Sequence, residues 1–303
     1  MSGEQSRFDV GAAAQLACLL EATAPKPGNV APAASFGDTR YDDFLASAAA
    51  IGDPLGTSAS RPLGQTILLA IEATRRWTSV NTNLGIVLLL APLARAAGLV
   101  PGSPTSLSPE ALRAALARVL AETTVDDARA AYAAIRLAAP GGLGTTDEQD
   151  IARDPTVTLT DAMRIAADRD GIASEYATSF RATFEIAAPV LCAARNDGLT
   201  WNDAIVETFL TLLARQPDTH IARRAGGALA RDVTDRAAEV VRLGGVRTPE
   251  GRVGLSRFDA SLRDERNRAN PGTTADITTA SIFVVLLAGG WHSRIGGVDA
   301  APR

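Results

Sequence analysis

Apolar residues recur every three to four positions along most of the chain, which is the spacing of helices with one buried face. Alanine and leucine dominate these stretches and favour helices, whereas the period-two alternation of strands is hard to find. The pattern predicts an all-α fold with helices over residues 9–23, 41–51, 62–77, 82–98, 108–122, 125–138, 159–168, 172–195, 201–215, 218–243, 256–268 and 273–289.

No fixed-period repeat and no long linker divides the chain, so we expect one compact domain over 9–290. Residues 1–8 and 291–303 are expected to be flexible ends. Two polar stretches, 140–158 and 244–254, are predicted to be loops.

The predicted helices 82–98 and 273–289 are apolar nearly all round, which indicates helices buried at the centre of a soluble fold. Their apolar runs are shorter than the roughly 20 residues that cross a membrane, so no membrane association is expected. Polar residues at their N-terminal ends should then face the interior or a cleft, where chemistry can be sought.

Composition narrows the classes of function. The chain has 303 residues with 30 Lys+Arg and 34 Asp+Glu, and this mild acidity argues against a nucleic-acid partner. Two cysteines and two histidines provide neither a disulfide framework nor a usual zinc site, which favours a cytoplasmic location. A metal would have to be a hard cation such as Mg²⁺ on carboxylates. Apolar helices could also pack in a homodimer.

Lys26 is the only lysine among the 30 basic residues, and it lies between Pro25 and Pro27. A chain that otherwise uses arginine keeps one compact ammonium here, which favours phosphate binding by a point charge. A solvated lysine in a turn is the plainer alternative. Gly28 permits the turn, and Asn29 completes the candidate segment.

Two further segments lie at the starts of the central helices. The first holds Asn81, Thr82, Asn83 and Gly85, and the second holds Asn270, Gly272, Thr273 and Asp276. A helix N-terminus offers free N–H groups to an anion, so both are candidate nucleotide-binding segments, although capping alone would explain their composition.

A fourth segment opens the predicted helix 218–243. Asp218 lies at the tip of a face of small residues, where it is either a metal ligand, a general base or only an N-cap. Thr219, Arg224 and Gly226 follow it, and Arg224 is a candidate phosphate ligand. Glu72 is a weaker metal-ligand candidate.

In their order and rough spacing, these segments together with Glu21 resemble the triphosphoribosyl-dephospho-CoA synthase family over about residues 10–290. The resemblance implies an all-α fold and attack of an acceptor hydroxyl on C1 of the ATP ribose, with adenine leaving and the triphosphate retained. Our leading hypothesis for such a reaction is that Asp218 and Asp276 hold Mg²⁺ or activate the attacking hydroxyl, and that one of the acidic residues Glu21, Glu72 or Glu175 supplements them.

The family's Asn-Thr-His-Lys-Gly pattern reads Asn81-Thr82-Asn83-Leu84-Gly85 in this chain. Residues 140–150 and 175–180 look more like the archaeal-type branch, for which methanopterin-type one-carbon cofactor biosynthesis is one setting and the acceptor is open. Two other readings are an Mg²⁺-dependent N-glycosyl or ADP-ribosyl hydrolase and a non-catalytic nucleotide-binding partner.

Overall fold

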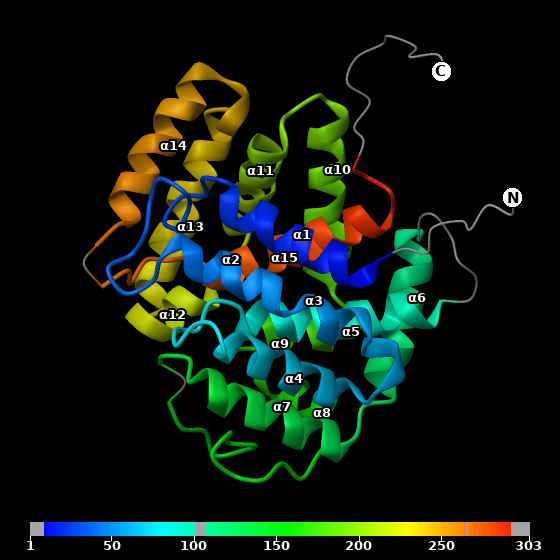
Figure 1. The fold of residues 1–303 in the computed structure, drawn as a ribbon. Helices are drawn as coiled ribbons and strands as arrows, with labels where there is room; N and C mark the ends of the chain where they lie inside the picture. The colour runs from blue at the N-terminus through cyan, green and yellow to red at the C-terminus, as the bar shows by residue number, and fades with distance from the viewer. Residues whose placement is uncertain (1–8, 101–106, 143, 265, 292–303) are drawn as a thin grey trace, which may run out of the picture.

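The computed structural model describes residues 9–100, 107–142, 144–264 and 266–291. Helices account for the regular structure of these residues, apart from one isolated bridge between Ala31 and Ala34 (Figure 1). The first half contains α1 (Val10–Thr23), α2 (Tyr41–Ala50), α3 (Gly52–Gly56), the 3₁₀ turn η1 (Ser58–Ser60), α4 (Leu63–Arg75), α5 (Leu84–Leu99), α6 (Pro109–Ala121) and α7 (Val125–Ala138). The second half contains α8 (Leu159–Ala166), α9 (Gly171–Ala177), the π-helical turn η2 (Ala182–Ala187), α10 (Ala188–Asn196), α11 (Trp201–Leu213), α12 (Thr219–Ala225), α13 (Gly227–Arg242), the 3₁₀ turn η3 (Gly245–Arg247), α14 (Pro249–Leu262) and α15 (Gly272–Leu287).

The all-α prediction is therefore confirmed, and the two helices predicted to be central are central. In α15 nearly every side chain is buried, and α1, α5, α10 and α11 pack around it. The buried hydroxyls of Thr278, Thr279 and Ser281 remain hydrogen-bonded because they donate to the helix's own carbonyls, as Thr278 does to Thr274 O at 2.8 Å. This core fixes the N-terminal ends of α5 and α15 at the interior of the molecule.

The predicted helix 172–195 is wrong, because the chain breaks after α9. Ser179 and Phe180 adopt left-handed backbone conformations, with φ of 50° and 58°. The buried carboxylate of Glu175 accepts from the backbone N–H groups of Ala182 and Thr183 and so supports the restart. Glu175 is thus a structural cap.

The predicted helix 218–243 is also wrong. Gly226 has φ 92° and separates α12 from α13, so Asp218 does not head one long helix face. The polar stretch 244–254 is not a loop, because it contains η3 and the first turns of α14. Thr248 caps α14 through the N–H of Gly251, and Pro249 stands in its first turn, a signal that lies before the predicted start at residue 256.

No helix within the described parts of the chain is long and apolar enough to cross a bilayer. The predicted flexible ends fall outside the described residues except for Trp291. Its ring stacks on that of Trp201 with centroids 5.5 Å apart, so residue 291 packs against α11.

Candidate active site

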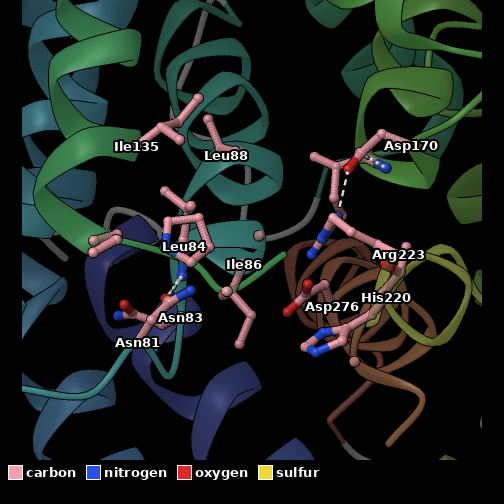
Figure 2. A pocket seen from close by; sticks show the side chains of 18 of the residues that line it. Asn81, Asn83, Leu84, Ile86, Leu88, Ile135, Asp170, His220, Arg223 and Asp276 are labelled. Atoms are coloured by element: carbon pink, nitrogen blue, oxygen red, sulfur yellow. Dashed lines mark hydrogen bonds and ion pairs between the residues drawn. The ribbon is translucent and has the colours of Figure 1, made fainter. Parts of the chain in front are cut away.

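A cavity of about 830 Å³ opens between the N-terminal ends of α5 and α15, and α7, α8, α9 and α12 complete its walls. Figure 2 shows residues of the α5 side facing residues of the α9, α12 and α15 side. Eleven of the predicted site residues line it: Glu21, Asn29, Asn81, Thr82, Asn83, Gly85, Arg224, Asn270, Gly272, Thr273 and Asp276. Four segments far apart in the sequence are thereby brought to one place.

The carboxyl group of Asp276 lies in this cavity. It projects from the first turns of α15 toward Gly85, and a Cβ atom at position 85 would occupy the space of its carboxyl oxygens. No described residue hydrogen-bonds this carboxyl group. Burial, followed by the negative charges of Glu21, Asp218 and Asp170, raises the pKa of Asp276 well above its usual range. The raised pKa favours the protonated form of this carboxyl group.

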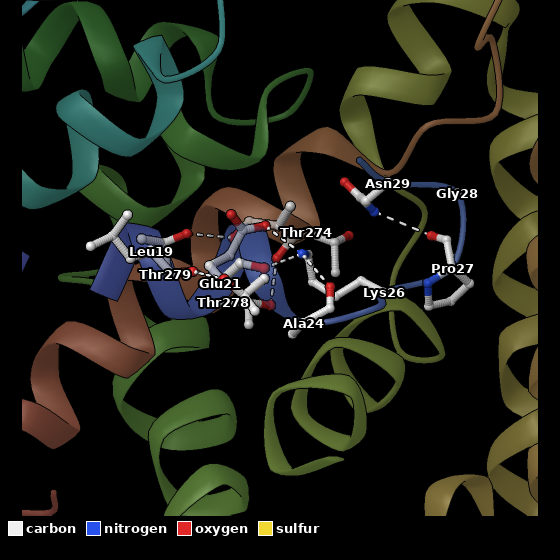
Figure 3. Close-up of polar contacts among 12 residues, drawn as sticks. Leu19, Glu21, Ala24, Lys26, Pro27, Gly28, Asn29, Thr274, Thr278 and Thr279 are labelled. Carbon is white, nitrogen blue, oxygen red and sulfur yellow. Dashed lines mark hydrogen bonds and ion pairs between the residues drawn. The ribbon is translucent and has the colours of Figure 1, made fainter. Parts of the chain in front are cut away.

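Glu21 lies close to Asp276 but is paired. Its carboxylate accepts from Lys26 Nζ at 3.0 Å, and the two side chains are almost fully buried (Figure 3). The ammonium group also donates to the carbonyl oxygens of Glu21 and Ala24, so each of its three N–H bonds has an acceptor. Lys26 does not line the cavity. The structure thus places the only lysine as an internal counter-ion rather than at the predicted phosphate site.

Asp218 is likewise occupied by structural contacts. One carboxyl oxygen accepts from the N–H groups of His220 and Ile221, and the other accepts from the N–H and hydroxyl of Thr274 at 2.7 Å. Burial raises the pKa of Asp218, while these four hydrogen bonds oppose the rise. Asp218 thus caps α12 and links it to α15, and we call this set of contacts the Asp218 clasp. Because Asp218 also lies outside the main cavity, this geometry is not that of a metal ligand or a general base.

The first and last predicted segments hold each other in place. Asn270 donates to Gly28 O at 2.8 Å, and Asn29 donates to Pro27 O at 3.2 Å. Gly28 has φ 70° and packs against Leu262, so only glycine fits this turn. Pro27 and Gly28 therefore shape the loop, whereas Asn29 and Asn270 line the cavity.

The Asn81–Gly85 segment combines capping with access to the cavity. Asn81 Oδ1 accepts from the N–H of Leu84 at 3.1 Å, and Asn83 donates to Thr74 at 3.0 Å. The hydroxyl of Thr82 pairs with that of Ser47. The expected helix start is confirmed, and part of each polar side chain is used to hold it.

Sequence reasoning missed three cavity residues that stand near Asp276. His220 lines the cavity beside Asp276 (Figure 2), and burial, together with the charges of Arg223 and Arg224, lowers its pKa to about 3. Arg223 pairs with Asp170 at 3.1 Å on the same wall. The available signal was that His220 is one of only two histidines and lies two residues after the helix cap Asp218.

Comparison with known proteins assigns the family. A family model described as ATP:dephospho-CoA triphosphoribosyl transferase matches residues 7–295. This chain belongs to that family. A crystal structure from Archaeoglobus fulgidus, named for triphosphoribosyl-dephospho-CoA synthase, is 29% identical with a TM-score of 0.62, covering 82% of this chain and 100% of that one.

A relative from Klebsiella pneumoniae is named 2-(5''-triphosphoribosyl)-3'-dephosphocoenzyme-A synthase. It is 29% identical over 119 residues, which are 39% of this chain and 42% of that enzyme. The match thus spans less than half of the Klebsiella enzyme. The family resemblance carried by the four segments is confirmed, and the family is one of transferases.

The remaining predicted residues of this transferase-family chain lie outside the cavity. Thr219 bonds to the hydroxyl of Thr273 at 3.0 Å and accepts from the N–H of Gly171. Gly226 is an exposed helix break, and Glu72 is exposed on α4, away from the cavity walls.

The donor set predicted for Mg²⁺ does not assemble. Asp218 is saturated by four donors, Glu21 is paired with Lys26, and Glu72 lies elsewhere. Among the described residues, no three His, Cys, Asp or Glu side chains gather in a way that could hold a metal ion. We derive no step through Mg²⁺.

Proposed function

We propose that this chain transfers a triphosphoribosyl group from ATP to a hydroxyl group of dephospho-CoA and releases adenine. One observation carries the proposal: a cavity built from the four segments contains the half-buried carboxyl group of Asp276, which no described residue hydrogen-bonds, close to cavity-lining arginines. Family membership supplies the reaction class.

The reaction breaks the C1–N9 bond of ATP and forms a C1–O bond to the acceptor. The acceptor hydroxyl loses one proton, and the departing adenine needs one proton on nitrogen, so the atoms balance without a further reagent. A glycosyl centre of this kind develops positive charge in its transition state, which a nearby carboxylate stabilises.

Asp276 is suited to proton transfer. Its raised pKa favours the protonated carboxyl group, whose proton can be donated to the adenine nitrogen as the glycosidic bond breaks. The acceptor hydroxyl then restores that proton. Glu21, held in an ion pair with Lys26, provides a second carboxylate at the same end of the cavity and favours the developing positive charge.

Arginines take the phosphate-binding role that the sequence assigned to Lys26. Arg223 and Arg224 line the cavity from α12, and Arg169 lines it from the segment after α8. Planar guanidinium groups bind phosphate oxygens through paired hydrogen bonds. Asn81, Asn83 and Asn270 are placed to orient the nucleotide by hydrogen bonds.

The test measures adenine by chromatography and the product by mass spectrometry after incubation of the purified chain with ATP. Adenine formed in amounts equal to triphosphoribosyl-dephospho-CoA is the expected result. Adenine that requires a pterin-type acceptor would move the reaction to one-carbon cofactor biosynthesis, and adenine formed with water alone would make the chain a hydrolase. ATP binding with no adenine under any of these conditions would overturn transfer and favour a nucleotide-binding partner.

A further inference from the structure

One side of the cavity is lined by apolar stripes from neighbouring helices. On α8 the lining residues recur with helical spacing at Leu159, Ala162, Met163 and Ala166. Leu84 and Leu88 stand one turn apart on α5, and Ile135 faces them from α7 (Figure 2). We name the set Leu84, Leu88, Ile135, Leu159 and Met163 the apolar wall.

The apolar wall is sheltered from bulk water. Leu84 and Ile135 are each 8% exposed and Leu88 is 6% exposed, although all three line the cavity. Two polar side chains of α7 next to the wall are hydrogen-bonded within the protein. The Tyr132 hydroxyl donates to Gln149 O at 2.8 Å, and Arg136 donates to Ile151 O at 2.6 Å.

The opposite wall of the cavity is polar and charged. Arg223, Asp170, His220 and Asp276 face the cavity there, across from Leu84 and Leu88 (Figure 2). A triphosphate placed on the apolar wall would lose its hydration without gaining hydrogen bonds, which is strongly unfavourable. An uncharged flat ring placed there would gain from the burial of apolar area and from contacts with the side chains.

We propose that the apolar wall is the subsite for an uncharged aromatic ring and that Leu84 determines this specificity. The ring is supplied either by the adenine of ATP or by the acceptor, and dephospho-CoA carries an adenine of its own. The identity of these two ligands rests on the proposed function, whereas the preference for a ring over phosphate can be measured by binding alone.

The experiment titrates adenosine, ATP, dephospho-CoA and inorganic tripolyphosphate into the full chain by calorimetry. Leu84→Asn replaces the side chain by a polar one of similar size without adding a charge, and Met163→Gln does so at a second position of the wall. Leu84→Met is the matched apolar control. Circular dichroism establishes that each variant keeps the helix content of the wild type.

We expect Leu84→Asn and Met163→Gln to raise the Kd of a ring-bearing ligand about tenfold, equivalent to about 1.4 kcal/mol, and Leu84→Met to change it by less than about threefold. The Kd of tripolyphosphate should stay within about twofold. A rise for adenosine and ATP identifies the ring as the donor's adenine, and a rise confined to dephospho-CoA identifies it as the acceptor's.

Three results would overturn the inference. The variants could raise the Kd of tripolyphosphate as much as that of the ring ligands, or they could change no Kd at all. The third result is a wild-type chain that binds tripolyphosphate but none of the ring-bearing ligands. Failure of the proposed function is separate, because it would show as absent adenine formation in a wild-type chain whose ring binding still depends on Leu84.

Discussion

Replacement of Lys26 by methionine separates the two roles that this residue could have. In the structure Lys26 is 1% exposed, pairs with Glu21 at 3.0 Å and donates to two backbone carbonyls at the end of α1. Methionine has a similar length and keeps the apolar contacts of the stem, but it removes all three donors. Glu21 would then be left as a buried charge without its partner.

The magnitude follows from that geometry. Removal of one member of a buried ion pair costs about 3–5 kcal/mol, because the remaining charge is uncompensated. We therefore expect Lys26→Met to lower the free energy of unfolding by about 4 kcal/mol. The double variant Glu21→Gln/Lys26→Met leaves no isolated charge, so it should recover about 2 kcal/mol of that loss.

Urea denaturation followed by circular dichroism gives these free energies, and titration with tripolyphosphate on the folded protein gives the phosphate affinity. The counter-ion role predicts a large loss of stability, partial recovery in the double variant and a phosphate Kd within about threefold of wild type. A Lys26→Met chain as stable as wild type but about tenfold weaker for tripolyphosphate would refute it, and Lys26 would then be a phosphate ligand.

Three other changes test separate parts of the site. Gly85→Ala should reduce kcat/KM for adenine release about 100-fold because its Cβ displaces the Asp276 carboxyl group, and near-normal kinetics would contradict that packing. Asp218→Ala should destabilise the chain by about 3 kcal/mol in urea denaturation, since donors on α12 and Thr274 lose their acceptor, and an unchanged midpoint would argue against the clasp. His220 has a folded pKa of about 3 against an ordinary 6.5, so its contribution to stability is complete above pH 6.5 and is lost as pH falls toward 3. His220→Gln should therefore lose less stability than wild type between pH 7 and pH 4.5, and equal losses would show that the histidine does not titrate this way.

The sequence predicted the helices best where a long apolar run decides the structure. The helices at 82–98 and 273–289 are buried on every face, so their existence did not depend on details of capping, and the candidate segments at their N-termini followed correctly. It failed where backbone conformation interrupts a continuous apolar pattern. The left-handed pair Ser179 and Phe180 cannot be read from periodicity, because neither residue is a usual left-handed residue.

The candidate site shows a similar limit. Eleven predicted residues line one cavity, and eight of them belong to the segments at the starts of the two central helices, α5 and α15. The direction in which a side chain turns could not be predicted, however. Lys26 turns inward to Glu21, and Asp218 turns to Thr274, because each finds buried partners that are remote from any local pattern.

The most direct test of the account is a single-turnover measurement of adenine release from ATP with dephospho-CoA by the wild type and Asp276→Asn. The substitution keeps the shape of the side chain and removes its transferable proton. We expect the rate to fall about 10²–10⁴-fold while the Kd of ATP changes by less than about threefold. Adenine release by Asp276→Asn at the wild-type rate would contradict the central claim that this carboxyl group in the α5–α15 cavity catalyses the transfer.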